Sequence, residues 1–171
     1  MKLIPIAVLS LLALCTLSAL SSSATRAGPA WRADAVEEIK AVLTDFHAAA
    51  AEADADRYFG HLAQDSVFFG TDASERWPFD EYEALLRPHL ERGTKLENVP
   101  VKQNVFVSED GRFAWFDEQL EKPRYGEMRA TGVLRHTDGG WEIVQFHLTL
   151  PVANEIIGDV VKLTRAAQKS R

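Results

Sequence analysis

The last third of the chain alternates between apolar and polar residues, as the strands of a half-buried sheet do. Four such runs cover residues 99–107, 113–120, 125–136 and 141–150. Turn-forming residues separate them, namely Glu109-Asp110-Gly111, Lys122-Pro123-Arg124 and Thr137-Asp138-Gly139-Gly140. Because short turns join neighbouring strands, the pattern predicts four strands in an antiparallel meander.

Before residue 99 the apolar residues recur every three to four positions, which is typical of amphipathic helices. Helices are expected over residues 34–54, 56–62 and 80–90, with a fourth in the tail, 154–171. Two of them open with a possible capping box, Asp34 with Glu37 and Asp80 with Glu83. A short strand is expected over residues 66–71. Helices followed by a meander predict an α+β fold, with N-terminal helices packed on one face of a curved antiparallel sheet.

The run 141–150 is the main indication of a pocket. Successive side chains of a strand point to opposite faces, which gives the sets Trp141, Ile143, Gln145, His147, Thr149 and Glu142, Val144, Phe146, Leu148, Leu150. The second set is apolar after its first member and is expected to face the core. The first set begins apolar and ends polar, with an imidazole near its end. We therefore expect its polar end to line a pocket.

The Lys122-Pro123-Arg124 turn decides which residues of its two strands face each other. If the turn is centred on Pro123, Asp117 lies opposite Arg129, and Trp115 lies opposite Thr131. The remaining polar residues of these strands, Glu118, Glu127 and Arg135, are then expected in solvent.

The Asp138-Gly139-Gly140 turn leaves two registers open. A two-residue turn would pair Thr131 with Phe146. A three-residue turn with a bulge would pair Thr131 with Gln145, and Arg129 with His147. We favour the bulged turn, because it gathers one polar set on one face: Asp117, Arg129, Thr131, Gln145 and His147. In the alternative, Asp117 and Arg129 form an ordinary ion pair on a solvated face.

The N-terminus reads as a targeting segment. Lys2 precedes an uncharged, largely apolar run over residues 3–24 that ends in small residues. This predicts a secretory signal peptide over residues 1–24, with a membrane anchor as the alternative. A linker over 25–33, one domain over 34–153 and the tail would then form a secreted or periplasmic protein with no stable membrane association.

Composition narrows the chemistry. The 171 residues carry a net charge of −6 and no cluster of Lys and Arg, so nucleic acid is not an expected partner. The single cysteine, Cys15, lies in the predicted signal peptide, so the domain must be held by its core rather than by disulfides. Metal-ligand spacings, phosphate loops and nucleophile elbows are all missing. We expect no metal and no cofactor, and only acid–base chemistry if there is any reaction.

Four stretches of the chain resemble the SnoaL-like domain proteins of the nuclear transport factor 2-like (cystatin-like) superfamily. They contain Tyr58-Phe59, Leu62, Asp65 and Phe69-Gly70-Thr71-Asp72; Glu75-Arg76-Trp77; Tyr125-Gly126 and Val133-Leu134; and Gly140-Trp141, Val144-Gln145, Thr149, Val152 and Glu155. The resemblance implies a cone in which helices close over the concave face of the sheet around an internal pocket. It also implies dimerisation through the back of the sheet, and an aspartate acid–base, for which Asp117 is the nearest candidate by strand position.

Several further side chains are candidates for lining the pocket, and each also has a structural alternative. Asp72 and Glu75, on a loop at the expected mouth, could hold a ligand or simply cap the loop. Trp77 and Tyr58 could contact a ligand or pack in the core. Trp115, expected opposite Thr131, is a further candidate for contact with a ligand. His147 could act as a base or as a hydrogen-bonded structural histidine.

Three functions remain open. The first is an exported protein that binds a small, mostly apolar molecule and has no assigned reaction. The second is an isomerase, cyclase or dehydratase in which Asp117 and His147 transfer protons. The third is a homodimerisation or partner-binding module that uses the outer sheet face or the tail.

Overall fold

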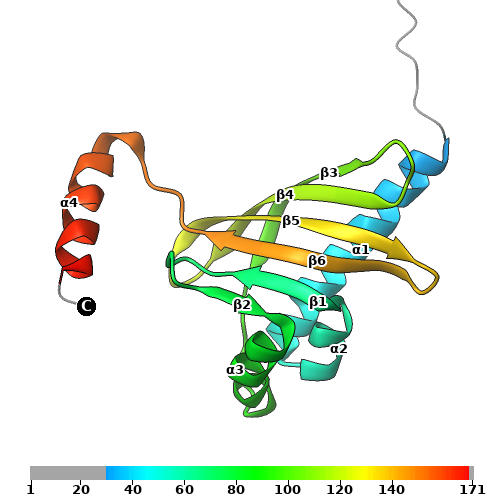
Figure 1. Ribbon diagram of the computed structural model, residues 1–171, viewed down its shortest axis with the longest axis horizontal. Coiled ribbons are helices and arrows are strands. Elements are labelled where there is room, and N and C mark those ends of the chain that lie inside the picture. The colour runs from blue at the N-terminus through cyan, green and yellow to red at the C-terminus, as the bar shows by residue number, and fades with distance from the viewer. Residues whose placement is uncertain (1–29, 170–171) are drawn as a thin grey trace, which may run out of the picture.

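The protein is described by a computed structural model over residues 30–169 (Figure 1). The elements in chain order are α1 (Ala30–Glu52), α2 (Ala55–Gly60), β1 (Leu62–Phe69), β2 (Arg76–Pro78), α3 (Phe79–Glu91), β3 (Val99–Val107), β4 (Phe113–Lys122), β5 (Gly126–Thr137), β6 (Gly140–Thr149), η1 (Asn154–Ile156) and α4 (Ile157–Gln168). The predicted signal peptide and its cleavage site lie outside the described residues. Within residues 30–169, no helix has the length and apolar character needed to span a membrane.

The six strands form one sheet in the order β2-β1-β6-β5-β4-β3. The meander β3 to β6 is antiparallel, as predicted, and the fold is α+β. The sheet as a whole is mixed, because β1 lies parallel to β6. The short strand β2, which the sequence did not indicate, pairs with the end of β1.

Helix starts differ from the capping boxes expected from the sequence. The helix α1 begins at Ala30, inside the segment expected to be a linker, so Asp34 lies within the helix rather than at its N-cap. The helix α3 begins directly after Pro78, whose side chain makes no capping bond. Its first residue, Phe79, is buried and packs edge-on against the Phe59 ring, with 6.1 Å between ring centroids. Burial of an aromatic ring therefore accompanies the start of α3.

The core lies between α1 and one face of the sheet. Figure 1 shows α1 crossing behind the strands. The helix buries Ile39, Leu43 and Phe46, and the strands contribute the alternate residues Ala114, Phe116, Leu120, Met128, Ala130 and Leu134. We call this covered side the core face and the opposite side, which faces the viewer in Figure 1, the outer face.

The β4–β5 turn is centred one residue later than predicted. Lys122 pairs with Gly126, and Asp117 lies opposite Thr131 rather than opposite Arg129. Each residue of β4 therefore faces a residue two positions further along β5 than expected. Because every second side chain of a strand points to the same face, this shift leaves the faces unchanged.

The β5–β6 turn is the tight two-residue turn, not the bulged one that we favoured. Thr137 pairs with Gly140, which leaves Asp138 and Gly139 as the central residues. The bulge lies further along, since Leu134 pairs with Ile143 but Val133 pairs with Gln145. Val144 is thus an extra residue with no partner on β5. After it, the alternation of side chains between the two faces of β6 is shifted by one position. Trp141 and Ile143 are therefore buried on the same side as Phe146, and the strict alternation predicted for residues 141–150 is wrong.

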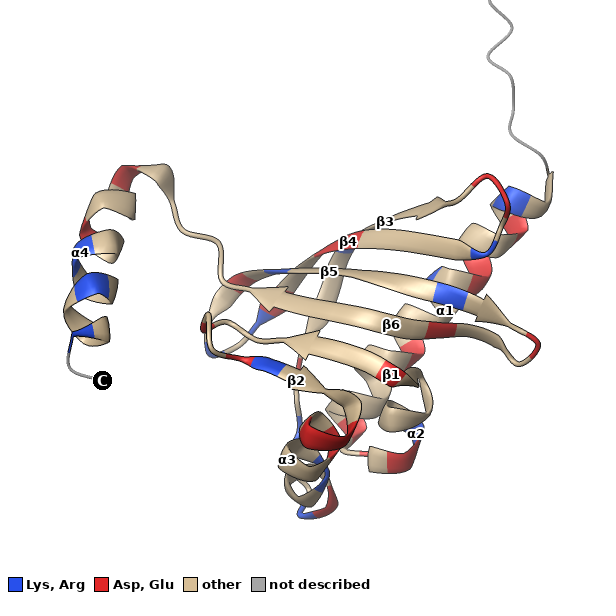
Figure 2. Cartoon of the chain, in the orientation of Figure 1, with Lys and Arg blue, Asp and Glu red and all other residues tan. Residues whose placement is uncertain are grey.

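The tail forms a helix, as predicted. Figure 1 shows α4 projecting away from the sheet, beyond the end of β6, and none of its residues is buried. In Figure 2, acidic and basic residues are interspersed on the helices, while the central parts of the strands carry few charges.

Candidate functional site

A cavity of about 410 Å³ opens at the end of the sheet where β1 and β6 finish and the β4–β5 hairpin turns. This end lies nearest to α4 in Figure 1. The residues that line the cavity are Phe68, Gly70, Thr71, Glu75, Trp77, Leu96, Lys122, Tyr125, Met128, Leu148 and Leu150. A volume of this size falls within the range of small-molecule sites, which are mainly apolar with a few polar groups.

The loop between β1 and β2 forms one side of the mouth, and hydrogen bonds fix its shape. The Ser74 amide donates to Asp72 Oδ1 (2.9 Å), and the Asp72 amide donates to Glu75 Oε2 (3.0 Å). The Gly70 amide donates to the Glu75 carbonyl (3.0 Å). Asp72 thus shapes the turn, whereas Glu75 both closes the loop and lines the cavity.

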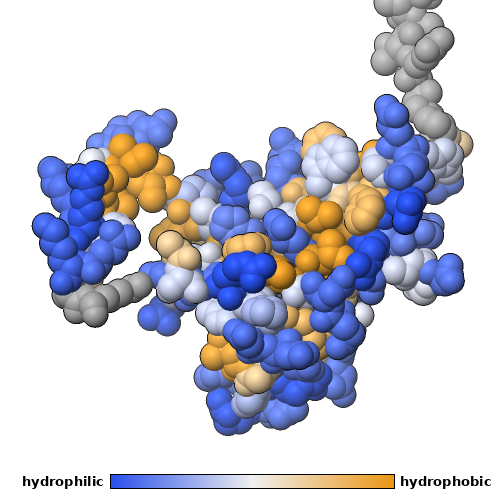
Figure 3. All heavy atoms as spheres, viewed as in Figure 1, coloured by the Kyte–Doolittle hydropathy of each residue, from blue (hydrophilic) through white to orange (hydrophobic). Residues whose placement is uncertain are grey.

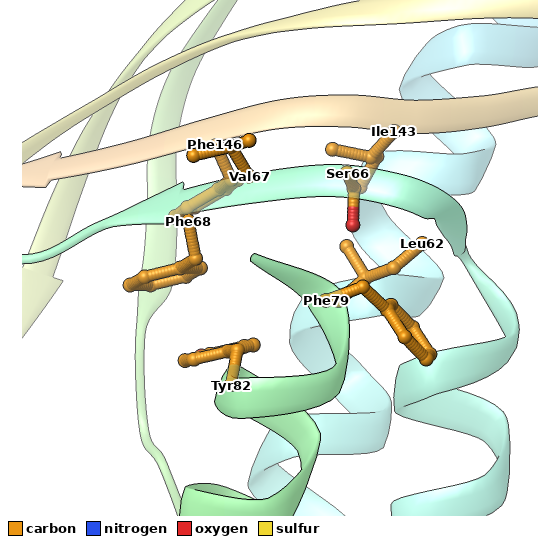
Figure 4. Close-up of a pocket in the computed structure, with 8 residues that line it drawn as sticks. All are labelled: Leu62, Ser66, Val67, Phe68, Phe79, Tyr82, Ile143 and Phe146. Carbon is orange, nitrogen blue, oxygen red and sulfur yellow. The ribbon is translucent and has the colours of Figure 1, made fainter. Parts of the chain in front are cut away.

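Aromatic side chains close the inner end of the space between α3 and the sheet. Phe68 stacks on Tyr82, with 4.0 Å between ring centroids, and on Phe146, with 5.3 Å. Figure 4 shows Phe68 of β1 next to Tyr82 of α3, while the ring of Phe79 points away from these two. The residues drawn there leave no room for a water molecule between them. They form a packed floor rather than a binding site.

Tyr58 belongs to this packed interior. Its hydroxyl lies 2.8 Å from the Tyr82 hydroxyl, and both residues are buried. Burial raises the pKa of the Tyr58 hydroxyl and that of Tyr82. The core-packing alternative therefore describes Tyr58, which does not line the cavity at the mouth. Trp77 does line it, and its ring lies 6.3 Å from that of Phe68.

Lys122 brings a positive charge to the cavity. It is the last residue of β4 and lies on the core face, in alternation with Glu118 and Leu120. Its Nζ lies 5.5 Å from the centre of the Tyr125 ring. Burial lowers the pKa of the Lys122 ammonium. Sequence reasoning treated Lys122 only as a turn residue, although its position at the end of an alternating run places it on the core face.

A carboxylate and an imidazole are buried together deeper in the core. Glu118 is 1% exposed and His47 is 3% exposed. His47 Nε2 lies 2.9 Å from Glu118 Oε2, and Gln103 Nε2 donates to Glu118 Oε1 at 2.7 Å. His47 Nδ1 is buried without a hydrogen-bond partner among the described residues. The expectation that Glu118 lies in solvent is wrong, because Glu118 alternates with the buried residues Phe116 and Leu120.

This buried pair lies close to the cavity but does not open into it. Glu118 pairs with Ala130, which in turn pairs with the cavity residue Leu148. On the helix side, the Leu96 amide, another part of the lining, donates to the Ala50 carbonyl of α1 (2.9 Å), one turn after His47. At 1% and 3% exposure, the two groups are covered by their neighbours.

The polar set expected in the pocket lies on the outer face instead. Asp117, Arg129, Thr131, Gln145, His147 and Trp115 share the side of the sheet opposite to α1. The expectation that these residues line a pocket is therefore wrong, although they do share one face of the sheet. Two causes combine: the odd positions of β4 and β5 face outward, and the β6 bulge turns the polar end of that strand outward too.

On that face Asp117 and His147 are not in contact. They lie on β4 and β6 with β5 between them, and two strand spacings amount to about 10 Å. Asp117 Oδ1 accepts from Asn104 Nδ2 (2.8 Å), and His147 Nε2 lies 3.2 Å from Thr149 Oγ1. In the described part of the chain, no group of three His, Cys, Asp or Glu residues could hold a metal ion.

The model of the SnoaL-like domain family matches residues 39–153 of the sequence. The match spans well over half of the chain, so the protein belongs to the SnoaL-like domain family. No curated protein matches the sequence.

Solved structures similar to this chain share the fold of nuclear transport factor 2-like (NTF2-like) proteins. An NTF2-like protein of unknown function from Pseudomonas putida has 21% identity and a TM-score of 0.57, over 72% of this chain and 91% of that one. A candidate dehydratase of the NTF2-like family from Streptomyces avermitilis has 17% identity and a TM-score of 0.57, over 71% and 99%. An NTF2-like protein with a cystatin-like fold from Novosphingobium aromaticivorans has 17% identity and a TM-score of 0.54, over 69% and 82%. At these identities the likeness shows the fold alone, and it confirms the predicted resemblance.

Proposed function

We propose that this domain binds a small, mostly apolar molecule in the cavity at the open end of the sheet. The observation that carries the proposal is the cavity itself, which has about 410 Å³ of space. Its walls are largely apolar, with Trp77, Met128 and Leu148 among them, and Glu75 and Lys122 add polar groups. Apolar walls with a few polar groups are typical of sites that bind by burial and orient by hydrogen bonds.

Filling the cavity should weaken binding. We expect Leu148→Trp to lower the affinity for the fluorescent apolar probe N-phenyl-1-naphthylamine at least about tenfold, because the larger side chain occupies the space of the probe. Gln119→Trp, which adds the same side chain on the outer face, is the matched control and should leave the affinity unchanged. Fluorescence titration measures both. Equal affinities for wild type and Leu148→Trp would contradict the proposal.

Acid–base catalysis by Asp117 and His147 has less support. The two groups lie on the exposed outer face, about two strand spacings apart. Each is already hydrogen-bonded to a neighbouring side chain, Asn104 or Thr149.

The outer face favours a second candidate function, self-association with another copy of the chain. Phe106 and Trp115 are 47% and 50% exposed, and their rings stack with 5.8 Å between centroids. Phe113, on the same face, is 43% exposed. Figure 3 shows apolar residues among polar ones on this side of the sheet. Exposed aromatic clusters of this kind mark interaction surfaces.

Sedimentation velocity distinguishes the outer face from the tail as the interface. We expect the domain to sediment as a dimer and Trp115→Glu to sediment as a monomer at the same concentration, because the substitution places a charge in the apolar contact. Leu163→Glu, in the exposed helix α4, should remain dimeric. Dissociation by Leu163→Glu alone would assign the interface to the tail, and a monomeric wild type would refute self-association.

A further inference from the structure

We propose that the molecule bound in the cavity is an apolar anion, such as an aliphatic or aromatic carboxylate, and that Lys122 binds its charged group. This inference rests on the proposed binding function and specifies its ligand class. It is carried by the position of Lys122 and by the charges around it.

The Lys122 ammonium is partly withdrawn from water in apolar surroundings. Along β4 the preceding residue on the same face is Leu120, which is fully buried, and Met128 lies opposite Leu120 on β5. Lys122, Met128 and Leu148 line the same cavity. Removing a charge from water costs free energy unless a partner of opposite charge is supplied.

Lys122 has no such partner within the described residues. Its ammonium lies against the ring of Tyr125, and burial lowers its pKa. The loop residue Glu75 is the carboxylate of the cavity lining, and it does not form an ion pair with Lys122. Glu75 Oε2 instead accepts the amide of Asp72. The cavity is therefore adjacent to a cation that lacks an anion.

The rest of the hairpin supports this assignment. Arg124 also lies over the Tyr125 ring, with 5.5 Å between its Cζ and the ring centroid, so two cations flank one aromatic side chain at the mouth. An anionic group at Lys122 would leave the apolar part of the ligand to extend toward Trp77 and Leu148. This orientation also keeps the anion on the hairpin side of the cavity, away from the loop that carries Glu75, so that the like charges are separated.

Two probes with the same ring system test the inference. N-Phenyl-1-naphthylamine is uncharged, and 8-anilinonaphthalene-1-sulfonate carries one sulfonate on the same skeleton. We expect Lys122→Met to weaken the sulfonate roughly tenfold or more, because a charge-assisted contact is lost, and to change the affinity of the neutral probe less than about twofold. Lys122→Arg should retain sulfonate binding. Lys102→Met, which removes an exposed lysine from β3, is the matched control and should alter neither affinity.

The pH dependence of sulfonate binding gives a second readout. An ammonium binds the anion below its pKa, and the affinity is lost as the pH rises through that pKa. Since the pKa of Lys122 is lowered, this loss should come at a lower pH than for an ordinary lysine. The other ionisable groups of the cavity lining are Glu75 and Tyr125, and Arg124 lies over the Tyr125 ring. Any pH dependence that persists in Lys122→Met belongs to them.

The outcomes separate the two proposals. If neither probe binds the wild type, or if Leu148→Trp binds both probes as tightly as the wild type does, the cavity is not the binding site. Both proposals are then overturned. If both probes bind in the cavity but Lys122→Met weakens them equally, or weakens neither, the binding function stands and the anion inference is overturned. Thermal melting of each variant verifies that it is folded.

Discussion

Replacing His47 with leucine is expected to lower the free energy of unfolding by about 3 kcal/mol, toward the upper end of the usual cost of leaving a buried polar group without one of its hydrogen-bond partners. The substitution leaves the Glu118 carboxylate in the core with Gln103 as its remaining hydrogen-bond donor. Glu118→Leu should also be costly, because it leaves the imidazole buried without its carboxylate. Urea unfolding followed by tryptophan fluorescence measures both variants.

The double variant His47→Leu/Glu118→Leu provides the decisive comparison. It removes both polar groups together, so its cost should be well below the sum of the two single costs. His89→Leu, on the exposed side of α3, is the control and should stay within about 0.5 kcal/mol of the wild type. Additive single costs would show that the two groups are not coupled.

Gly132→Ala is expected to destabilise the protein by about 3 kcal/mol, at the upper end of the usual cost of overpacking. A Cβ at this position would overlap the carbonyl oxygen of Gln145 and would lie 2.6 Å from Phe116 Cε1. The ring can shift, but the carbonyl belongs to the backbone of β6. Because this close approach lies beside the bulge that sets the faces of β6, the probe affinity of the cavity should fall as well.

Two further variants test whether the overlap at Gly132 causes the loss of stability. Gly60→Ala, at the end of α2, would place its Cβ with no atom within 4 Å and should be neutral or slightly stabilising. Adding Phe116→Leu to Gly132→Ala should recover only part of the lost stability, since the Gln145 carbonyl remains. Thermal melts and urea titrations measure the series. A Gly132→Ala protein as stable as Gly60→Ala would contradict the proposed overlap.

The fold was largely predictable because its signals are local. The alternation over residues 99–150 and the three turns were sufficient to give the meander. The parallel pairing of β1 with β6 joins residues far apart in the sequence, and no local pattern records it. The strand β2 has three residues, too few for a periodicity to be read.

The site was harder to predict, in part because the faces of β6 depend on one inserted residue. The bulge at Val144 exchanges the faces of β6, and valine suits either side of a sheet, so the sequence gives no sign of it. For Glu118 a signal was present, since Phe116 and Leu120 occupy the same face of β4. Its charge argued for exposure, and the alternation argued for burial. The alternation was the better guide, because a buried carboxylate is stable when a distant residue, here His47, supplies its partner.

The placement of β1 beside β6 has a consequence for the order in which the chain can fold. A polypeptide that emerges from the ribosome N-terminus first has completed β1 long before residues 143–147, its parallel partner, exist. Until then Phe68 lacks the neighbour Phe146 on which it stacks, and a strand edge stays open. Contacts between segments far apart in the sequence slow folding. They also prolong the exposure of hydrophobic surface and unpaired strand edges, which promote aggregation. The nascent chain therefore cannot complete its sheet and core until its last strand, β6, has been synthesised.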